Sequence, residues 1–154
     1  MKKIFIILSL IFLSGCSNSI TKDYLQSSPW VGDLSPLVEY MEGSSPLSIE
    51  IEFHENSVDY YIDSNDFYNV ILSQPGNDDF DDNPFSRGMT QSIIGPYLDN
   101  SFEYDLDGDN LNIHTNIEGL KTGTVKLIKT SEGFEAEFIN AETSEDLIIE
   151  FKKK

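Results

Sequence analysis

The sequence predicts a mainly β fold, an antiparallel up-and-down meander of about eight strands that forms a lipocalin-like barrel or a strongly curved sheet. Two observations predict it. Apolar and polar residues alternate through Leu47–Phe53, which is the period of a half-buried strand. Later apolar segments are separated by short turn sequences such as Asp107-Gly108-Asp109, which favour hairpins between sequence neighbours. Closure of such a meander would leave room inside for side chains or one small ligand.

The folded part is expected to start at Pro29-Trp30, where a polar stretch ends. Serine and proline at the start of Ser35–Gly43, with glycine at its end, are typical of one or two helical turns. Residues 73–84 are rich in proline, glycine, asparagine and aspartate, which predicts a surface loop. Strands are predicted over residues 47–53, 58–62, 67–72, 102–106, 110–115, 122–130, 133–139 and 147–151.

One short helix is predicted around residues 84–94. Asn83-Pro84 is a typical helix start, and Gly95-Pro96 is a typical stop. Between them, Phe85, Met89 and Ile93 recur every four residues. This spacing places the three side chains on one face, so we expect an amphipathic helix that packs on the sheet.

The first sixteen residues resemble the signal of a bacterial lipoprotein. Two lysines precede the apolar run Ile4–Leu13, and Leu13-Ser14-Gly15-Cys16 matches a lipobox. The run is too short to cross a bilayer. The resemblance implies cleavage before Cys16, acylation of Cys16 and an extracytoplasmic protein anchored to a membrane by lipid. The residue after Cys16 is Ser17 and not the aspartate that favours inner-membrane retention in enterobacterial lipoproteins. The resemblance therefore favours the outer membrane, if the organism has one.

We therefore expect a cleaved signal peptide over residues 1–15, a lipidated tether over 16–28 and a single β domain over 29–154. Within this domain, Trp30-Val31-Gly32, YDLDGDNLNI at 104–113 and GFEAEFINAETSEDLIIEF at 133–151 resemble a bacterial lipocalin-like domain. In the classical lipocalins a glycine stands two places before the tryptophan, whereas Gly32 stands two places after it. The resemblance implies a barrel and transfers no ligand.

Charge restricts the partners. The chain has 10 basic and 27 acidic residues, a formal net charge of −17, and removal of residues 1–15 takes away two lysines and no acid. A nucleic-acid partner is not expected, because binding a polyanion needs a basic surface. Basic proteins, cations and uncharged ligands are compatible with this charge.

Two acidic segments contain the oxygen ligands that a metal site needs. Asp105, Asp107 and Asp109 alternate like the first ligands of a calcium loop, but the sixth and twelfth places hold Asn110 and Asn116 instead of glycine and glutamate. A hairpin turn therefore explains this segment better than a metal site. The acidic loop 77–83 contains Asp78, Asp79, Asp81 and Asp82, for which a solvated loop is favoured and calcium binding stays open.

No catalytic residue, cofactor or metal is predicted, and we do not expect an enzyme. The only imidazole bases, His54 and His114, fall on the polar phase of strands, as do the carboxylate pairs Glu50 and Glu52, and Glu135 and Glu137. No nucleophile motif or phosphate loop is present.

The aromatic residues of the predicted strands either fill the core or line a cavity, and the core is favoured. This set comprises Tyr60, Tyr61, Phe67, Tyr68, Tyr97, Phe102 and Tyr104. The favoured function is non-enzymatic binding of a small apolar ligand by a membrane-anchored envelope lipoprotein, which calls for a cavity of about 300 Å³ or more. The alternative is an immunity or inhibitor protein that binds a basic partner through its acidic surface and has a filled core.

Overall fold

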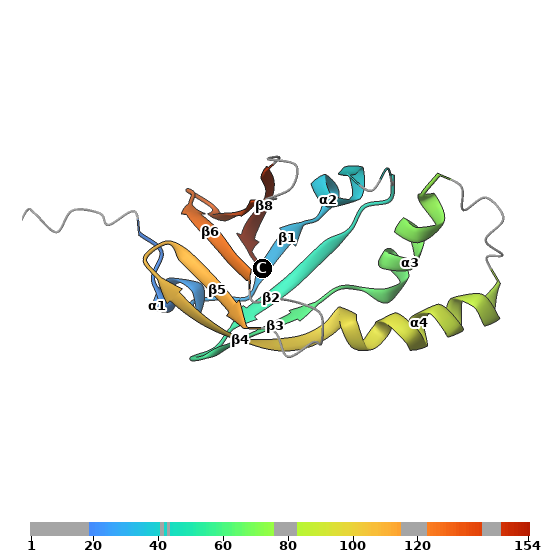
Figure 1. The fold of residues 1–154 in the computed structure, drawn as a ribbon, viewed down its shortest axis with the longest axis horizontal. Helices are drawn as coiled ribbons and strands as arrows, with labels where there is room; N and C mark the ends of the chain where they lie inside the picture. The colour runs from blue at the N-terminus through green and yellow to red at the C-terminus, as the bar shows by residue number, and fades with distance from the viewer. Residues whose placement is uncertain (1–18, 41, 43, 76–82, 115–122, 140–145) are drawn as a thin grey trace, which may run out of the picture.

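A computed structural model describes residues 19–40, 42, 44–75, 83–114, 123–139 and 146–154. In this part of the chain eight antiparallel strands form a closed barrel (Figure 1). Each strand pairs with its neighbour in sequence, and β1 pairs with β8 to close the circle. The predicted up-and-down β fold is confirmed, and the sheet closes into a barrel instead of staying open. The strands are β1 (Trp30–Asp33), β2 (Ser48–Phe53), β3 (Ser57–Tyr61), β4 (Asp99–Asp107), β5 (Asn110–His114), β6 (Gly123–Lys129), β7 (Gly133–Ile139) and β8 (Asp146–Lys153).

The predicted hairpins form between β2 and β3, between β4 and β5, and between β6 and β7. The turn between β4 and β5 places Gly108 at a φ of +61°, and Asp107 pairs with Asn110 across it. A glycine at the first central position is what a two-residue hairpin of type II′ requires. The turn at 54–57 is closed by a hydrogen bond from the His54 amide to the Ser57 carbonyl.

Two strand assignments differ from the prediction. The segment over 67–72 is not a strand but lies in helix α3 (Ser64–Ser73). The side chain of Asp63 accepts hydrogen bonds from the amides of Asn65 and Asp66, and this N-cap starts a helix despite the β-branched residues that follow. The strand β1 was not predicted, because four residues with a glycine among them give no clear alternation.

Three further helices accompany α3: α1 (Lys22–Leu25), α2 (Ser35–Tyr40) and α4 (Pro84–Leu98). The helical turns predicted after Ser35 are therefore confirmed, as is the helix around 84–94. Helix α4 is longer than predicted and continues past Pro96, which lies in its last turn, to the buried Leu98.

The expected packing of α4 is wrong. Figure 1 shows α3 and α4 extending beyond the barrel, with α4 leading directly into β4. The helix packs against α3, where Arg87 lies over the Tyr68 ring and Gln91 donates a hydrogen bond to Asn65. Phe85, the first residue of the row predicted to face the sheet, is 79% exposed. The side of α4 opposite this row is the one that α3 covers.

The segment from Ile20 to Ser28, predicted to belong to a tether, instead closes one end of the barrel. Ile20 and Leu25 are buried, and Leu25 is completely inaccessible to solvent. The Ile20 amide donates to Asp109 in the β4–β5 turn, and the Tyr24 hydroxyl donates to the Gly133 carbonyl at the start of β7. The short helix α1 is thus fastened to two different turns and acts as a plug.

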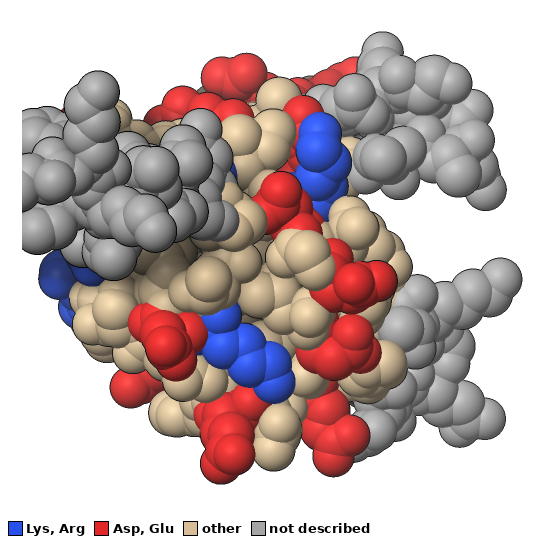
Figure 2. All heavy atoms as spheres, turned by 90° about the vertical axis from the view of Figure 1, so that its left-hand side faces the viewer, with Lys and Arg blue, Asp and Glu red and all other residues tan. Residues whose placement is uncertain are grey.

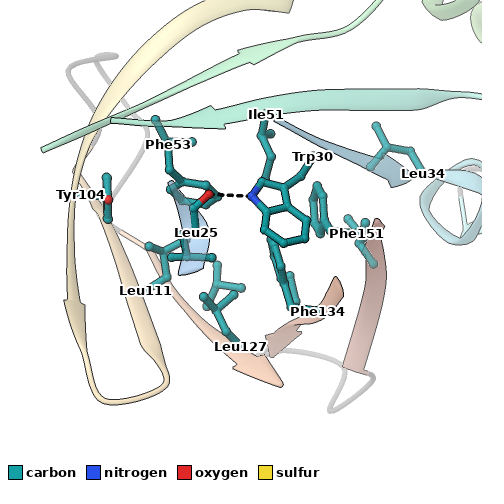
Figure 3. Close-up of a cluster of buried hydrophobic side chains, with 14 of the residues drawn as sticks. Leu25, Trp30, Leu34, Ile51, Phe53, Tyr104, Leu111, Leu127, Phe134 and Phe151 are labelled. Carbon is teal, nitrogen blue, oxygen red and sulfur yellow. Dashed lines mark hydrogen bonds between the residues drawn. The ribbon is translucent and has the colours of Figure 1, made fainter. Parts of the chain in front are cut away.

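The core lies between this plug and the barrel walls (Figure 3). The Trp30 side chain is fully buried, and its indole Nε1 donates to the Leu25 carbonyl at 2.7 Å. Position 32 requires glycine, because a Cβ there would lie 2.5 Å from the Phe151 ring. This close approach explains the glycine two places after the tryptophan.

Candidate functional site: an apolar pocket in the barrel

A pocket of about 240 Å³ lies inside the barrel. Every strand except β1 contributes to its wall. The lining residues are Ile49, Ile51, Phe53, Val58, Tyr60, Phe102, Leu111, Ile113, Val125, Leu127, Phe134, Ala136, Phe138 and Phe151. No ionisable side chain except the Tyr60 phenol is among them. The pocket can therefore accept an apolar group by the hydrophobic effect, and it offers a charged group no partner.

Packed aromatic rings make the floor of the pocket. The Phe134 ring stacks on Phe151, with centroids 4.9 Å apart, and meets Trp30 edge-on at 5.0 Å. Phe53 meets the Tyr104 ring edge-on at 5.3 Å. These rings are all buried and lie toward the end that α1 closes (Figure 3). The pocket therefore does not pass through the barrel.

The opposite end of the pocket is less covered. Lining residues near that end are only half-buried, among them Ile49, Tyr60, Phe102, Ile113 and Phe138. Two of the connections at this end, 115–122 and 140–145, lie outside the described residues. We take this end, where β2, β4 and β6 begin, as the mouth.

Tyr60 supplies the polar group nearest the mouth. Its ring stacks on Phe102 at 5.3 Å, and its hydroxyl donates to the Tyr97 carbonyl at the end of α4. Burial, and to a lesser extent the charge of Asp99, raises the pKa of Tyr60 above its usual value. The hydroxyl therefore stays protonated at neutral pH and joins the barrel wall to α4.

The predicted aromatic set divides among several places. Tyr60 and Phe102 line the pocket, whereas Tyr104 belongs to the core and donates its hydroxyl to the His54 carbonyl. Tyr68 is buried under α4, Phe67 is packed against the core, and Tyr61 and Tyr97 are exposed. Sequence reasoning missed the aliphatic lining and Ala136, although strand alternation places these residues on the inner face.

The carboxylates and histidines lie outside the barrel. Because Ile49, Ile51 and Phe53 point inward on β2, Glu50 and Glu52 between them point outward. Glu135 and Glu137 alternate in the same way with the inward residues of β7. The predicted water-facing position of both pairs is confirmed, and Glu50 and Glu137 form surface ion pairs with lysines.

Each histidine is paired with a strand aspartate on this outer face. His54 Nε2 lies 2.9 Å from Asp59, and His114 Nε2 lies 2.7 Å from Asp105. Both rings are almost half exposed, as predicted. A hydrogen bond from Asn112, followed by that from His114, holds the pKa of Asp105 below its usual value. The Asp59 carboxylate also accepts a hydrogen bond from the Ser101 side chain, and both pairs lie exposed on the outer face of the barrel.

In the described residues, no group of three or more histidine, cysteine, aspartate or glutamate side chains is placed to hold a metal ion. Asp105 binds His114, whereas Asp109 accepts the Ile20 amide, so the alternating aspartates serve the hairpin and the plug. The acidic loop 77–83 lies outside the described residues apart from Asn83, which caps α4. Cys16 also lies outside them.

The surface around the barrel differs from its interior. Acidic side chains are spread over the face at the α1 end (Figure 2). A second hollow, of about 500 Å³, lies against outward residues such as Val31, Asp33, Ser48 and Lys152. Its lining mixes charged and apolar groups, whereas the barrel pocket is lined by apolar groups, so we consider the apolar pocket the better candidate for a ligand site.

Comparison of the chain with models of protein families, with curated proteins and with solved structures finds no significant match. Among the helices of the described residues, none has the length and apolar character needed to cross a bilayer.

Proposed function

We propose that this protein binds the apolar part of a small ligand inside its β-barrel. The observation that carries the proposal is the apolar pocket, closed by aromatic rings at one end and less covered at the other. Its volume of about 240 Å³ is below the range of about 300–1,000 Å³ typical of sites for drug-sized molecules. The ligand is accordingly small or inserts only a narrow hydrocarbon chain, while any polar group stays at the mouth. The pocket favours this function over the alternative of an inhibitor with a filled barrel.

The place of action is part of the same proposal. The signal-like residues 1–15 and the lipobox ending at Cys16 support an extracytoplasmic lipoprotein. Only three residues separate Cys16 from Ile20, the first buried residue of the described chain, so the span between them is at most about 14 Å. An anchor at Cys16 would hold the α1 end against the membrane and direct the mouth away from it.

Ligand binding can be tested with 1-decanol, an uncharged molecule with one narrow chain. Trp30 is the only tryptophan and contacts Phe134 of the pocket floor, so its fluorescence reports on the pocket. In a chain that begins at Ser17, we expect saturable binding. Ala136→Leu fills the pocket and should weaken binding at least about tenfold, as expected when a ligand group loses its space.

Glu135→Leu is the matched control, because it adds a leucine at the next position of β7 on the outer face. This variant should bind as the unaltered chain does. Absence of saturable binding, or equal affinities of the two variants, would refute a ligand site in the barrel.

The anchor is tested separately by labelling the host with palmitate. We expect the full-length protein to take up label and sediment with membranes, and Cys16→Ala to lose both properties. An unlabelled full-length protein would refute the anchor without affecting the binding result.

A further inference from the structure

Helix α4 presents an apolar face that nothing in the described structure covers. Four large side chains follow one another along it at intervals of four residues: Phe85, Met89, Ile93 and Tyr97. They are 79%, 57%, 59% and 57% exposed. Large apolar side chains exposed together in this way mark an interaction surface more often than single exposed residues do. We call these four residues the α4 ridge.

Beside the ridge runs a row of small side chains. Its members, one position earlier in each turn, are Pro84, Gly88, Ser92 and Pro96, and all four are exposed. A Cβ placed on Gly88 would meet no atom within 4 Å. The face therefore consists of a ridge and an adjacent groove, both following the i, i+4 direction. Helices pack by inserting such a ridge into such a groove, most often with both helices using their i, i+4 rows.

The face is also uncharged. The single charged residue of α4 is Arg87, which lies over the Tyr68 ring at 4.4 Å on the side facing α3. The chain as a whole has a formal net charge of −17, so an uncharged helix face is unusual for it. A basic partner would find no carboxylate here to pair with. A second copy of the same acidic chain would find no like charge at the contact.

We propose that the α4 ridge is a self-association surface, and that two copies pair about a two-fold axis with the ridge of each in the groove of the other. Such an isologous contact needs one face that is complementary to itself, which a ridge beside a groove provides. Aromatic side chains bury about 150–250 Å² each when covered, and methionine and isoleucine bury less. The exposed fractions then give at most about 1,000 Å² for two copies, which is below the usual size of a stable specific interface. The dimer is therefore weak and exchanges with the monomer.

The projection of α4 beyond the barrel makes this pairing possible. Because α4 extends away from the barrel, most of its length lies beyond the barrel wall (Figure 1). The ridge also lies far from the α1 end, so the pairing does not depend on the proposed anchor. The pairing goes beyond the ligand-binding proposal and does not rest on it.

The test uses the full-length protein in its host cells. Ser92 lies near the middle of the groove, where a two-fold axis brings the two copies together, so Ser92→Cys should form covalent dimers with a short bis-maleimide. Ser131→Cys, in the exposed turn between β6 and β7, is the matched control. The unaltered chain measures any contribution of Cys16. We expect at least about tenfold more dimer from Ser92→Cys than from either control.

A second substitution then removes the ridge. Ile93→Glu in the Ser92→Cys chain should reduce the dimer at least about tenfold, and Met89→Glu should act in the same way. Both sites are more than half exposed, so the fold should tolerate them. Ile148→Glu is the matched control, because Ile148 is an exposed isoleucine on the barrel wall. It should leave the dimer unchanged.

Salt provides an independent measurement on the purified full-length protein in a non-ionic detergent. From about 0.1 M to about 1 M NaCl the Debye length falls from about 10 Å to about 3 Å. Repulsion between two acidic copies is then screened, so the dimer fraction seen by sedimentation should rise.

Three results would overturn the proposal. One is equal dimer yield from the groove and turn variants, and another is a dimer that survives both ridge substitutions. The third is evidence that something else covers the ridge. Crosslinking of the groove thiol to a different protein would assign the ridge to a heterologous partner. Protection of that thiol from a water-soluble maleimide until detergent is added would assign the ridge to the bilayer.

Discussion

Replacing Leu25 by alanine tests whether α1 is part of the fold or part of a tether. The Leu25 side chain is completely buried, and its carbonyl accepts the Trp30 indole. Truncation of a buried leucine costs about 2–5 kcal/mol through lost burial and the cavity left behind. We expect about 3 kcal/mol for Leu25→Ala, because a short terminal helix can adjust partly to the loss. For a domain of this size the melting temperature should fall by about 10 °C.

Urea unfolding followed by Trp30 fluorescence measures this cost in a chain that begins at Ser17. Asp23→Ala is the control in the same helix, since Asp23 is exposed. It should change the free energy of unfolding by less than about 0.5 kcal/mol. If Leu25→Ala changed stability no more than Asp23→Ala, the helix would not contribute to the folded state, and the argument for a plug would be wrong.

Two more predictions concern close packing and helix capping. Gly32→Ala should destabilise the barrel by about 1–3 kcal/mol, because the new Cβ meets the Phe151 ring, and Phe151→Leu should recover part of this loss in urea unfolding of the double variant. At neutral pH, Asp63→Ala should cost about 1 kcal/mol through loss of the α3 cap. Hydrogen bonds from the amides of Asp66 and then Asn65 hold the pKa of Asp63 below its ordinary value of 3.8. The carboxylate's contribution is therefore complete above that value and is lost as the pH falls through the folded-state pKa, so the difference between the original chain and Asp63→Asn should change only in acid.

The hairpins could be predicted because the forces that form them are local. Alternation over Leu47–Phe53 and the turn at Gly108 each involve residues close in sequence. The strand β1 could not be found in this way. Its pairing with β8 joins Trp30 to Lys153, across nearly the whole chain, and no local signal reports such a contact.

The misassigned segment 67–72 shows how a local signal can be read at the wrong period. Its aromatic and β-branched residues favour a strand, whereas the cap at Asp63 and the apolar positions Phe67, Val70 and Ile71 fit a helix. The helix forms because its cap is satisfied and its apolar face packs on the core, where Val70 is buried. The capping aspartate was the signal that could have decided between them.

The candidate site was only partly predictable. Strand alternation identifies which residues point inward, but it does not reveal whether their volumes fill the barrel. The core was the favoured place for the aromatic set, yet Tyr60 and Phe102 line a pocket. The apolar row of α4 was recognised from its spacing. Its exposure was not, because the sequence does not show that α3 covers the opposite side.

Stability and binding together separate a ligand site from a packing defect. Ala136 stands between Phe134 and Phe138 on the inner face of β7, and the space beside it is part of the pocket. Leucine there would bury three more carbon atoms, which stabilise the fold by up to about 2 kcal/mol if they fit. In a ligand site, Ala136→Leu therefore raises the free energy of unfolding while it weakens 1-decanol binding. If the space were only a packing defect, Ala136→Leu would raise the free energy of unfolding without weakening 1-decanol binding. The two effects must therefore be measured on the same variant.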